Sequence, residues 1–255
     1  MTRLDELLRK VEASTKRNPL LQRAAVVVGL SRALVVMRIR SRRAEGEREH
    51  ENIHLLMAFL LAPDSNCVDV GASYGVFLGD IVHLSPKGSH LAFEPIPILF
   101  DRLVSTFPEV DARCVALSDE SGEASFNWLP DEQGLSGLSE YKYAITATGQ
   151  QITVRTELLD EQLPPGYEPS LIKVDVEGAE YAVLRGGQRT LARFKPVLVI
   201  EYPRRGIPLQ GRGREDLYDF LISEIGYRVF DMIGNGPLSR SDFAESAGLN
   251  FVFHD

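Results

Sequence analysis

The chain has 255 residues, 44% hydrophobic and 25% charged, which suits a globular protein of one large domain or two small ones. The two cysteines, Cys67 and Cys114, lie in apolar runs, which favours buried thiols in a cytoplasmic protein over a disulfide framework or a metal site. The net charge is −8, but residues 1–45 carry eleven Lys and Arg against four Asp and Glu, so this basic arm has +7 and the rest has −15. An acidic body argues against nucleic acid as a partner.

The first 62 residues show apolar positions at helical spacing, with helices expected near the N-terminus, over 20–43 and over 46–62. The apolar stretch that begins at Ala24 is interrupted by Arg32 and is too short to span a bilayer. We interpret residues 1–62 as a helical N-terminal extension of a domain over 63–255. A lid, a homo-oligomer interface and peripheral contact of the basic arm with the inner face of the membrane are alternative roles for it.

From Cys67 onwards, predicted strands alternate with predicted helices. Strands are expected at 67–71, 90–95, 112–117, 171–176 and 195–202, and helices at 75–84, 96–108, 178–194 and 213–226. Two last strands, 227–232 and 249–254, have no clear long helix between them and are expected to be antiparallel neighbours. This alternation predicts an α/β fold with a Rossmann-like, doubly wound and mostly parallel sheet.

An insertion interrupts the alternation at about 123–158. Extra strands are expected at 123–129 and 150–159, and they flank a polar, Gly- and Ser-rich stretch at 133–150. A flap or acceptor-binding loop and an ordinary surface loop are both consistent with this composition.

The first predicted strand ends in a glycine loop, "VDVGASYG", which places Asp69 and Gly71 at its carboxyl end. In a doubly wound sheet, ligands bind beside this first strand-to-helix turn, and Gly71 and Gly75 permit close backbone approach. The loop is not a dinucleotide fingerprint, since Ser73 replaces the central glycine. Little in the loop therefore suggests phosphate binding.

Acidic residues also end the next two predicted strands. Glu94 follows Gly75 by 19 residues, where an acidic side chain commonly accepts hydrogen bonds from ribose hydroxyls. Asp119, after Ser118, could accept from an adenine amine or simply make a turn. Together with the glycine loop, these positions predict an adenosine held along three strand ends.

The segment "LIKVDVEGAE" ends a buried strand with Asp175, Glu177 and Glu180. The fourth core strand should lie beside the first, so Asp175 should face the same crevice, while Glu180 could instead cap the following helix. Glu201 ends the neighbouring strand "LVIE". Acids gathered in a crevice can bind hydroxyls, accept a proton or ligate a hard cation. Lys173 either pairs with one of these acids or marks an edge strand.

Five segments resemble, in order and spacing, the FkbM family of S-adenosylmethionine-dependent methyltransferases: "CVDVGASYGVF", "LAFEPIPILFDRL", "VALSDESGEASF", "LIKVDVEGAEYAVLRGG" and "PVLVIEY". The resemblance covers about residues 53–205 and implies the class I methyltransferase fold, with seven strands and the last one antiparallel. It also implies S-adenosylmethionine as cofactor and a sugar, glycoside or polyketide-like hydroxyl as acceptor, hence O-methylation of a small molecule or glycan. Some relatives have a histidine after the fifth-strand acid, where this chain has Tyr202 and Pro203.

The resemblance assigns a role to each predicted site residue. The cofactor-binding residues that it implies are Asp69, Gly71, Ser73, Tyr74, Gly75, Glu94, Pro95, Ser118 and Asp119. Asp175, Glu177 and Glu201 are implied to face the acceptor. We expect Asp175 or Glu201 to take the acceptor proton, directly or through a divalent cation such as Mg²⁺ that both would ligate. A nicotinamide-dependent oxidoreductase and a non-catalytic membrane- or glycan-binding module are the alternatives.

Overall fold

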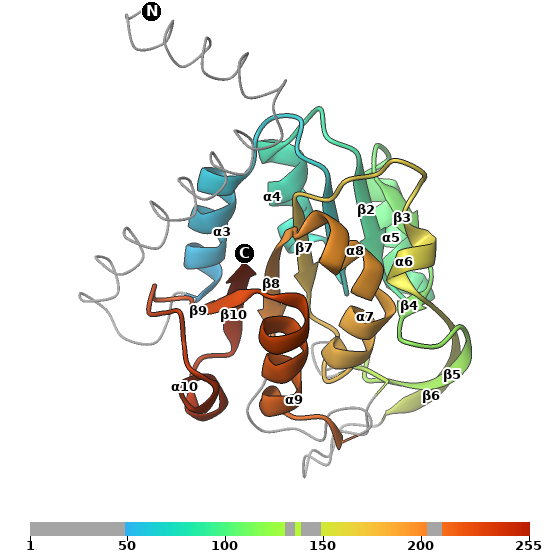
Figure 1. The fold of residues 1–255 in the computed structure, drawn as a ribbon. Coiled ribbons are helices and arrows are strands. Elements are labelled where there is room, and N and C mark those ends of the chain that lie inside the picture. The colour runs from blue at the N-terminus through green and yellow to red at the C-terminus, as the bar shows by residue number, and fades with distance from the viewer. Residues whose placement is uncertain (1–48, 131–135, 139–148, 203–210) are drawn as a thin grey trace, which may run out of the picture.

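A computed structural model (Figure 1) describes residues 49–130, 136–138, 149–202 and 211–255. The helices expected before residue 43, the basic arm over 1–45 and most of the 133–150 stretch lie outside these residues. Among the described helices, none is long and apolar enough to cross a membrane.

The central feature is a seven-stranded sheet in the order β3-β2-β1-β7-β8-β10-β9. Its strands are β1 (Cys67–Val70), β2 (His90–Phe93), β3 (Asp111–Arg113), β7 (Leu171–Val174), β8 (Val197–Glu201), β9 (Arg228–Asp231) and β10 (Asn250–His254). The first five are parallel along their pairings, whereas β10 is antiparallel to both β8 and β9. The predicted sheet, the adjacency of β1 and β7 and the antiparallel last pair are confirmed.

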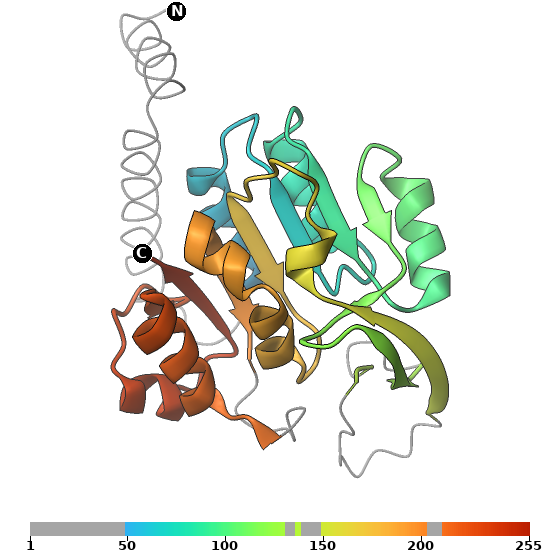
Figure 2. The ribbon, with the colours of Figure 1, turned by 45° about the vertical axis from the view of Figure 1, so that its right-hand side comes forward.

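Helices cover both faces of this sheet (Figures 1 and 2). They are α3 (Glu49–Leu60), α4 (Val76–Leu84), α5 (Pro97–Thr106), α6 (Leu159–Gln162), α7 (Glu180–Gly186), α8 (Gln188–Phe194), α9 (Arg214–Tyr218), a π-helical continuation over Asp219–Ile225 and α10 (Arg240–Glu245). Strands β1, β2 and β7 are buried at every position because both faces are covered. Val68 and Ile172 pack with α7 to α10, and Cys67 and Leu171 pack with α3 and α4.

Helix α3 confirms the helix expected over 46–62, and it packs directly on the sheet. Ile53, Leu56 and Met57 are almost fully buried in the same cluster as Leu171 of β7. Glu49 Oε2 accepts a hydrogen bond from Asn250 Nδ2 at 2.9 Å, which ties the start of α3 to β10. Residues 49–60 therefore contribute to the core, although the sequence placed them in an extension.

The strand expected over 112–117 is wrong as a single element. The chain turns after β3, where Val115 N donates to Arg113 O at 3.0 Å. Residues Ala116–Leu117 then form β4, which pairs with β6 (Gln150–Glu157) in a second sheet. The apolar run thus contributes to two sheets, because the residues before its central turn pair with β2 and those after it pair with β6.

The second sheet has three strands in the order β4-β6-β5, and β5 spans Gly122–Trp128. The two strands expected in the insertion are confirmed as β5 and β6, which pair antiparallel along their length. Figure 2 shows these strands near the edge of the large sheet where its parallel strands end. The insertion is therefore close to the edge at which ligands bind in such folds.

The single helix expected over 178–194 is also wrong, since α7 and α8 are separated at Gly187. A β carbon on Gly186 would lie 2.0 Å from the carbonyl oxygen of Ser118, and one on Gly187 would lie 2.7 Å from a methyl group of Leu159. The two glycines thus let the helical layer approach the segments that carry β4 and α6. This close packing interrupts a segment whose apolar periodicity looks continuous.

The turn between β7 and α7 is built around the buried side chain of Glu180. Its Oε1 accepts hydrogen bonds from Gly178 N at 2.9 Å and Val176 N at 3.3 Å, both in the turn before the helix, so Glu180 holds this turn together and the predicted capping of α7 is wrong. Its Oε2 has no hydrogen-bond partner among the described residues. Burial raises the pKa of Glu180 to about 7, while the backbone donors oppose this rise.

We expect Glu180→Gln to change how the free energy of unfolding depends on pH. Because the folded pKa of about 7 exceeds the unfolded value, Glu180 contributes stability below pH 4.5 that is lost as the pH rises through 7. Between pH 5 and pH 8, the wild type should therefore lose free energy of unfolding relative to the variant. Urea titrations at both pH values can measure this change. The exposed Glu161→Gln should show no such shift, and parallel curves for Glu180→Gln would contradict the interpretation.

Candidate functional site

A pocket opens at the carboxyl ends of β1, β2 and β7. Its walls come from the glycine loop, the segment after β2, the insertion and the turn after β7. It is lined by Val70, Gly71, Ser73, Phe93, Glu94, Pro95, Ile96, Leu99, Ala116, Leu117, Phe126, Ser136, Leu138, Asp175, Val176, Glu177 and Ala179. Six of the twelve predicted site residues thus share one pocket, namely Gly71, Ser73, Glu94, Pro95, Asp175 and Glu177.

Gly71 joins the first loop to the end of β7. Its φ of 76° lies in the left-handed region, and a β carbon there would lie 1.9 Å from the backbone oxygen of Asp175. No other residue fits at this position without displacing the backbone. The glycine therefore brings the loop after β1 and the turn after β7 into contact, so that both line one pocket.

Glu94 is held firmly at the pocket wall. Its Oε2 accepts a hydrogen bond from Ser73 N, and its Oε1 accepts one from Ile96 N, both at 2.9 Å. Burial raises the pKa of Glu94 to about 7, and the two backbone donors oppose that rise. Each carboxylate oxygen can accept a second hydrogen bond, so Glu94 can still receive two hydroxyl donors from a ligand.

The pocket also has an apolar wall next to Glu94. Ile96 and Leu99 lie at the start of α5, and they pack in one cluster with Ala116 and Phe126 of the second sheet. Leu138 packs against this cluster. A pocket that combines a hydroxyl-binding carboxylate with an apolar slot fits a nucleoside, whose ribose and base need these two environments.

The structure places the other predicted cofactor residues outside the pocket lining. Gly75 also has a φ of 76°, but a β carbon there would lie 2.4 Å from the Phe107 ring, so this glycine is required for packing of α4 on the end of α5. The Tyr74 side chain is 44% exposed, with the guanidinium of Arg102 4.9 Å from its ring centre.

Ser118 and Asp119 follow β4 and interact with each other. The Ser118 hydroxyl donates to Asp119 Oδ1 at 3.2 Å, and neither residue lines the pocket. Ala116 and Leu117, just before them, do line it. Their predicted roles at the adenine stay predictions.

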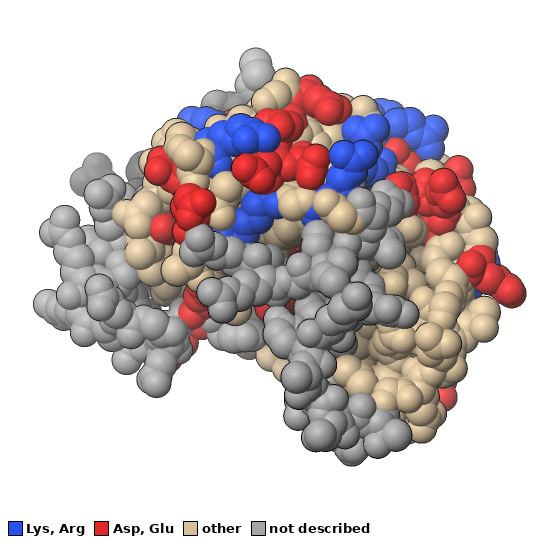
Figure 3. All heavy atoms as spheres, turned by 90° about the horizontal axis from the view of Figure 1, so that it is seen from below, with Lys and Arg blue, Asp and Glu red and all other residues tan. Residues whose placement is uncertain are grey.

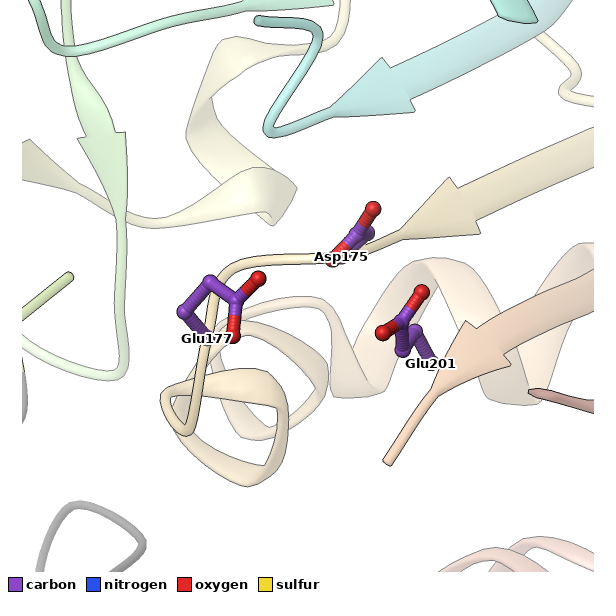
Figure 4. A group of neighbouring side chains, drawn as sticks. All are labelled: Asp175, Glu177 and Glu201. Carbon is purple, nitrogen blue, oxygen red and sulfur yellow. The ribbon is translucent and has the colours of Figure 1, made fainter. Parts of the chain in front are cut away.

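Three carboxylates converge beside the pocket (Figure 4). Asp175 follows β7, Glu177 lies in the next turn with a φ of 56°, and Glu201 is the last residue of β8. One oxygen of each lies within 4.8 Å of the others. The carboxyl ends of two adjacent parallel strands therefore deliver acids to one place, as the sequence predicts.

Lys173 lies buried beneath these acids. Its Nζ is 3.1 Å from Asp175 Oδ2, 3.6 Å from Asp69 Oδ1 and 4.9 Å from the Phe77 ring centre. Burial lowers the pKa of this lysine, but the charges of Asp175 and Asp69 outweigh it and raise the pKa above its usual value. The predicted ion pair is thus confirmed, and the edge-strand alternative is wrong, because β7 lies between β1 and β8.

Lys173 links Asp69 to the acids of the pocket, because its ammonium contacts both Asp69 and Asp175. The Asp69 side chain is 1% exposed, and neither oxygen has a hydrogen-bond partner among the described residues. Asp69 does not line the pocket. Its ion pair is with Lys173, and its charge also contributes to the raised pKa of Glu94.

Glu201 differs from Asp175 in its surroundings. Burial and the nearby negative charge of Asp175 raise the pKa of Glu201 to about 7, whereas Lys173 and a hydrogen bond from the Asn250 side chain oppose the rise. Asp175 is in contact with Lys173, whose Nζ lies 3.1 Å from Asp175 Oδ2. The pKa of about 7 suits Glu201 to bind and release a proton near neutral pH.

Figure 3 views the molecule from below, where described acidic and basic side chains are interspersed. Around Arg240, for example, lie Asp219 at 2.9 Å and Glu215 at 3.6 Å. These exposed pairs contribute little to stability. In this view, the charged side chains of the described residues do not gather by sign into two separate areas.

Several pocket residues were missed by sequence reasoning. Ile96 and Leu99 carried a usable signal, since they follow Glu94 directly at a helix start. Ser136 and Leu138 lie in the stretch over 133–150 for which a flap or binding loop was one of two expectations, whereas Phe126 carried no signal, because nothing in its local sequence shows that β5 reaches the pocket. Their contribution depends on tertiary packing.

Two curated relatives are methyltransferases. The hexuronic acid methyltransferase AglP of Haloferax volcanii is 31% identical over 137 residues, 51% of this chain and 53% of AglP. The 2-O-methyltransferase NoeI of Sinorhizobium fredii is 33% identical over 158 residues, 55% of this chain and 64% of NoeI. The chain thus spans about half to two thirds of the length of these relatives.

Similarity also extends to a solved structure and to a family model. The crystal structure of a methyltransferase FkbM from Methylobacillus flagellatus has a TM-score of 0.50 at 16% identity and covers 87% of this chain and 58% of that one, which shows a shared fold. The model of the Methyltransferase FkbM domain matches residues 69–229, from the buried acid of β1 to the second residue of β9. The chain belongs to the FkbM methyltransferase family.

Proposed function

We propose that this protein is an S-adenosylmethionine-dependent O-methyltransferase that acts on a hydroxyl of a sugar, glycoside or polyketide-like acceptor. The observation that carries the proposal is the arrangement of Glu94 and the Gly71 loop in one pocket with Asp175 and Glu177. Family membership and the names of the two relatives, a hexuronic acid methyltransferase and a 2-O-methyltransferase, support it.

The described residues fit the proposed cofactor. Glu94 would accept hydrogen bonds from the ribose hydroxyls, and Gly71 leaves room for a ligand because it has no side chain. When bound, S-adenosylmethionine supplies an electrophilic methyl group on a sulfonium. The protein's own contribution is to align the acceptor, exclude water and remove a proton.

Proton removal is the chemical task of the carboxylates. An acceptor hydroxyl would give its proton to a carboxylate of this group, so that its oxygen could take the methyl group that the cofactor would supply and S-adenosylhomocysteine would leave. We assign this proton to Glu201, because its pKa is raised to about 7, whereas Asp175 is already paired with Lys173 at 3.1 Å. Asp175 and Glu177 then serve to orient acceptor hydroxyls.

Cofactor binding provides the first test. S-adenosylhomocysteine should bind the wild type in calorimetry. Glu94→Gln should lower this affinity by about 10- to 100-fold, which is the scale expected for the loss of hydrogen bonds to a charged group. Since the pKa of Glu94 is raised to about 7, wild-type affinity should fall as the pH drops from 8 to 6, and the variant should not follow. The exposed Glu120→Gln serves as the control. Preferential binding of NAD would overturn the proposal in favour of an oxidoreductase.

The proton acceptor provides the second test. Transfer of labelled methyl to a panel of hexuronic acids, hexose glycosides and polyketide alcohols should fall at least about 100-fold in kcat for Glu201→Gln. The affinity for S-adenosylhomocysteine should stay within about twofold, since Glu201 does not line the cofactor pocket. Retained turnover in Glu201→Gln, with the loss found in Asp175→Asn instead, would reassign the base to Asp175.

A divalent cation held by Asp175 and Glu201 is the second form of this proposal, favoured by the closeness of three carboxylate oxygens. In that form, dialysis against EDTA should abolish methyl transfer, added Mg²⁺ should restore it, and S-adenosylhomocysteine binding should be unchanged. Full activity after EDTA would eliminate the cation and leave direct proton transfer to the carboxylate.

A further inference from the structure

The segment Ser136–Leu138 of the insertion lies between β5 and the acid-bearing turn after β7. Gly137 and Asn127 of β5 exchange two backbone hydrogen bonds, at 2.9 and 3.1 Å. The Ser136 hydroxyl accepts a third bond from Leu129 N at 2.9 Å. These contacts hold the segment to β5 through an isolated β-bridge.

Gly137 brings the other side of this segment against the acid-bearing turn. A β carbon at this position would lie 3.0 Å from Glu177 O, 3.3 Å from Glu177 Cβ and 3.4 Å from Val176 O. The φ of Gly137 is not in the left-handed region, so the limit here is space and not backbone conformation. The segment is therefore as close to the turn as a glycine permits.

Both neighbours of Gly137 line the pocket that contains Glu94. Ser136 is 7% exposed, and Leu138 packs with Phe126, Ile96 and Leu99. Ile96 follows Glu94 by two residues, so this apolar cluster begins where the proposed ribose site ends. A planar base attached to that ribose would meet an apolar wall, to which this segment contributes one side.

We propose that Ser136–Leu138 is a binding element for the base of the nucleoside, with Leu138 contacting the ring and Gly137 setting its distance from the acid-bearing turn. This inference rests on the proposed function, because it takes the ligand to be an adenine nucleoside. Gly137 lies against the turn that carries Glu177, so the segment would join the cofactor pocket to the acceptor side.

Leu138→Ala tests the contact directly. Removing this side chain should lower the affinity for S-adenosylhomocysteine by about 5- to 30-fold, the range for loss of one large apolar contact. The affinity for adenosine alone should fall by the same factor, because the lost contact is to the base. Leu138→Met, which keeps the volume, should bind within about twofold of the wild type. Leu163→Ala, another half-buried leucine outside the pocket, should leave both affinities unchanged.

Gly137 tests the spacing independently of Leu138. Gly137→Ala adds a β carbon 3.0 Å from Glu177 O and should lower the affinity for adenosine modestly. Gly137→Val should lower this affinity further. Thermal unfolding of each variant checks that the fold is retained.

The outcomes separate this inference from the proposed function. Failure of the wild type to bind S-adenosylhomocysteine would overturn both. Tight wild-type binding that is unchanged in Leu138→Ala and Gly137→Val would overturn only the role of this segment. A loss for S-adenosylhomocysteine with unchanged adenosine affinity would also overturn it, since the contact would then lie on the amino acid part of the ligand.

Discussion

The close approach of Gly71 to the backbone of Asp175 is the constraint on which the site depends. A β carbon at Gly71 would lie 1.9 Å from the Asp175 carbonyl oxygen, and Asp175 N donates to Val70 O at 3.1 Å. These contacts continue the β1–β7 pairing past the last strand residues. As a result, the glycine loop after β1 and the turn that carries the acids form adjoining walls of one pocket.

Charge compensation under that pocket comes from Lys173. One buried ammonium is shared between Asp69 and Asp175, and its removal would leave two carboxylates without their cation. Such a loss typically costs about 3–5 kcal/mol in a buried pair. The lysine contacts Asp175 directly, and it also opposes the rise to about 7 that burial and the charge of Asp175 cause in the pKa of Glu201.

The small second sheet adds the wall that the large sheet lacks. Strands β4, β5 and β6 place Phe126 beside Ile96 and Leu99, and the segment Ser136–Leu138 closes the distance to the turn after β7. The apolar side of the site therefore combines residues of the second sheet with residues at the start of α5, and Gly137 brings the insertion against the turn that carries Glu177.

The sequence by itself determined the order of strands and helices, and it identified Gly71, Glu94, Asp175 and Glu201 as strand-end residues, because alternating apolar runs that end in glycine or acid are local patterns. Only the tertiary structure decided the rest. The apolar run at 112–117 divides between two sheets, Gly75 serves helix packing, and Lys173 pairs with two acids. Leu138 reaches the pocket from a distant insertion. Each of these depends on which surfaces meet in space, and contacts between residues far apart in the chain leave no periodic signal in either segment.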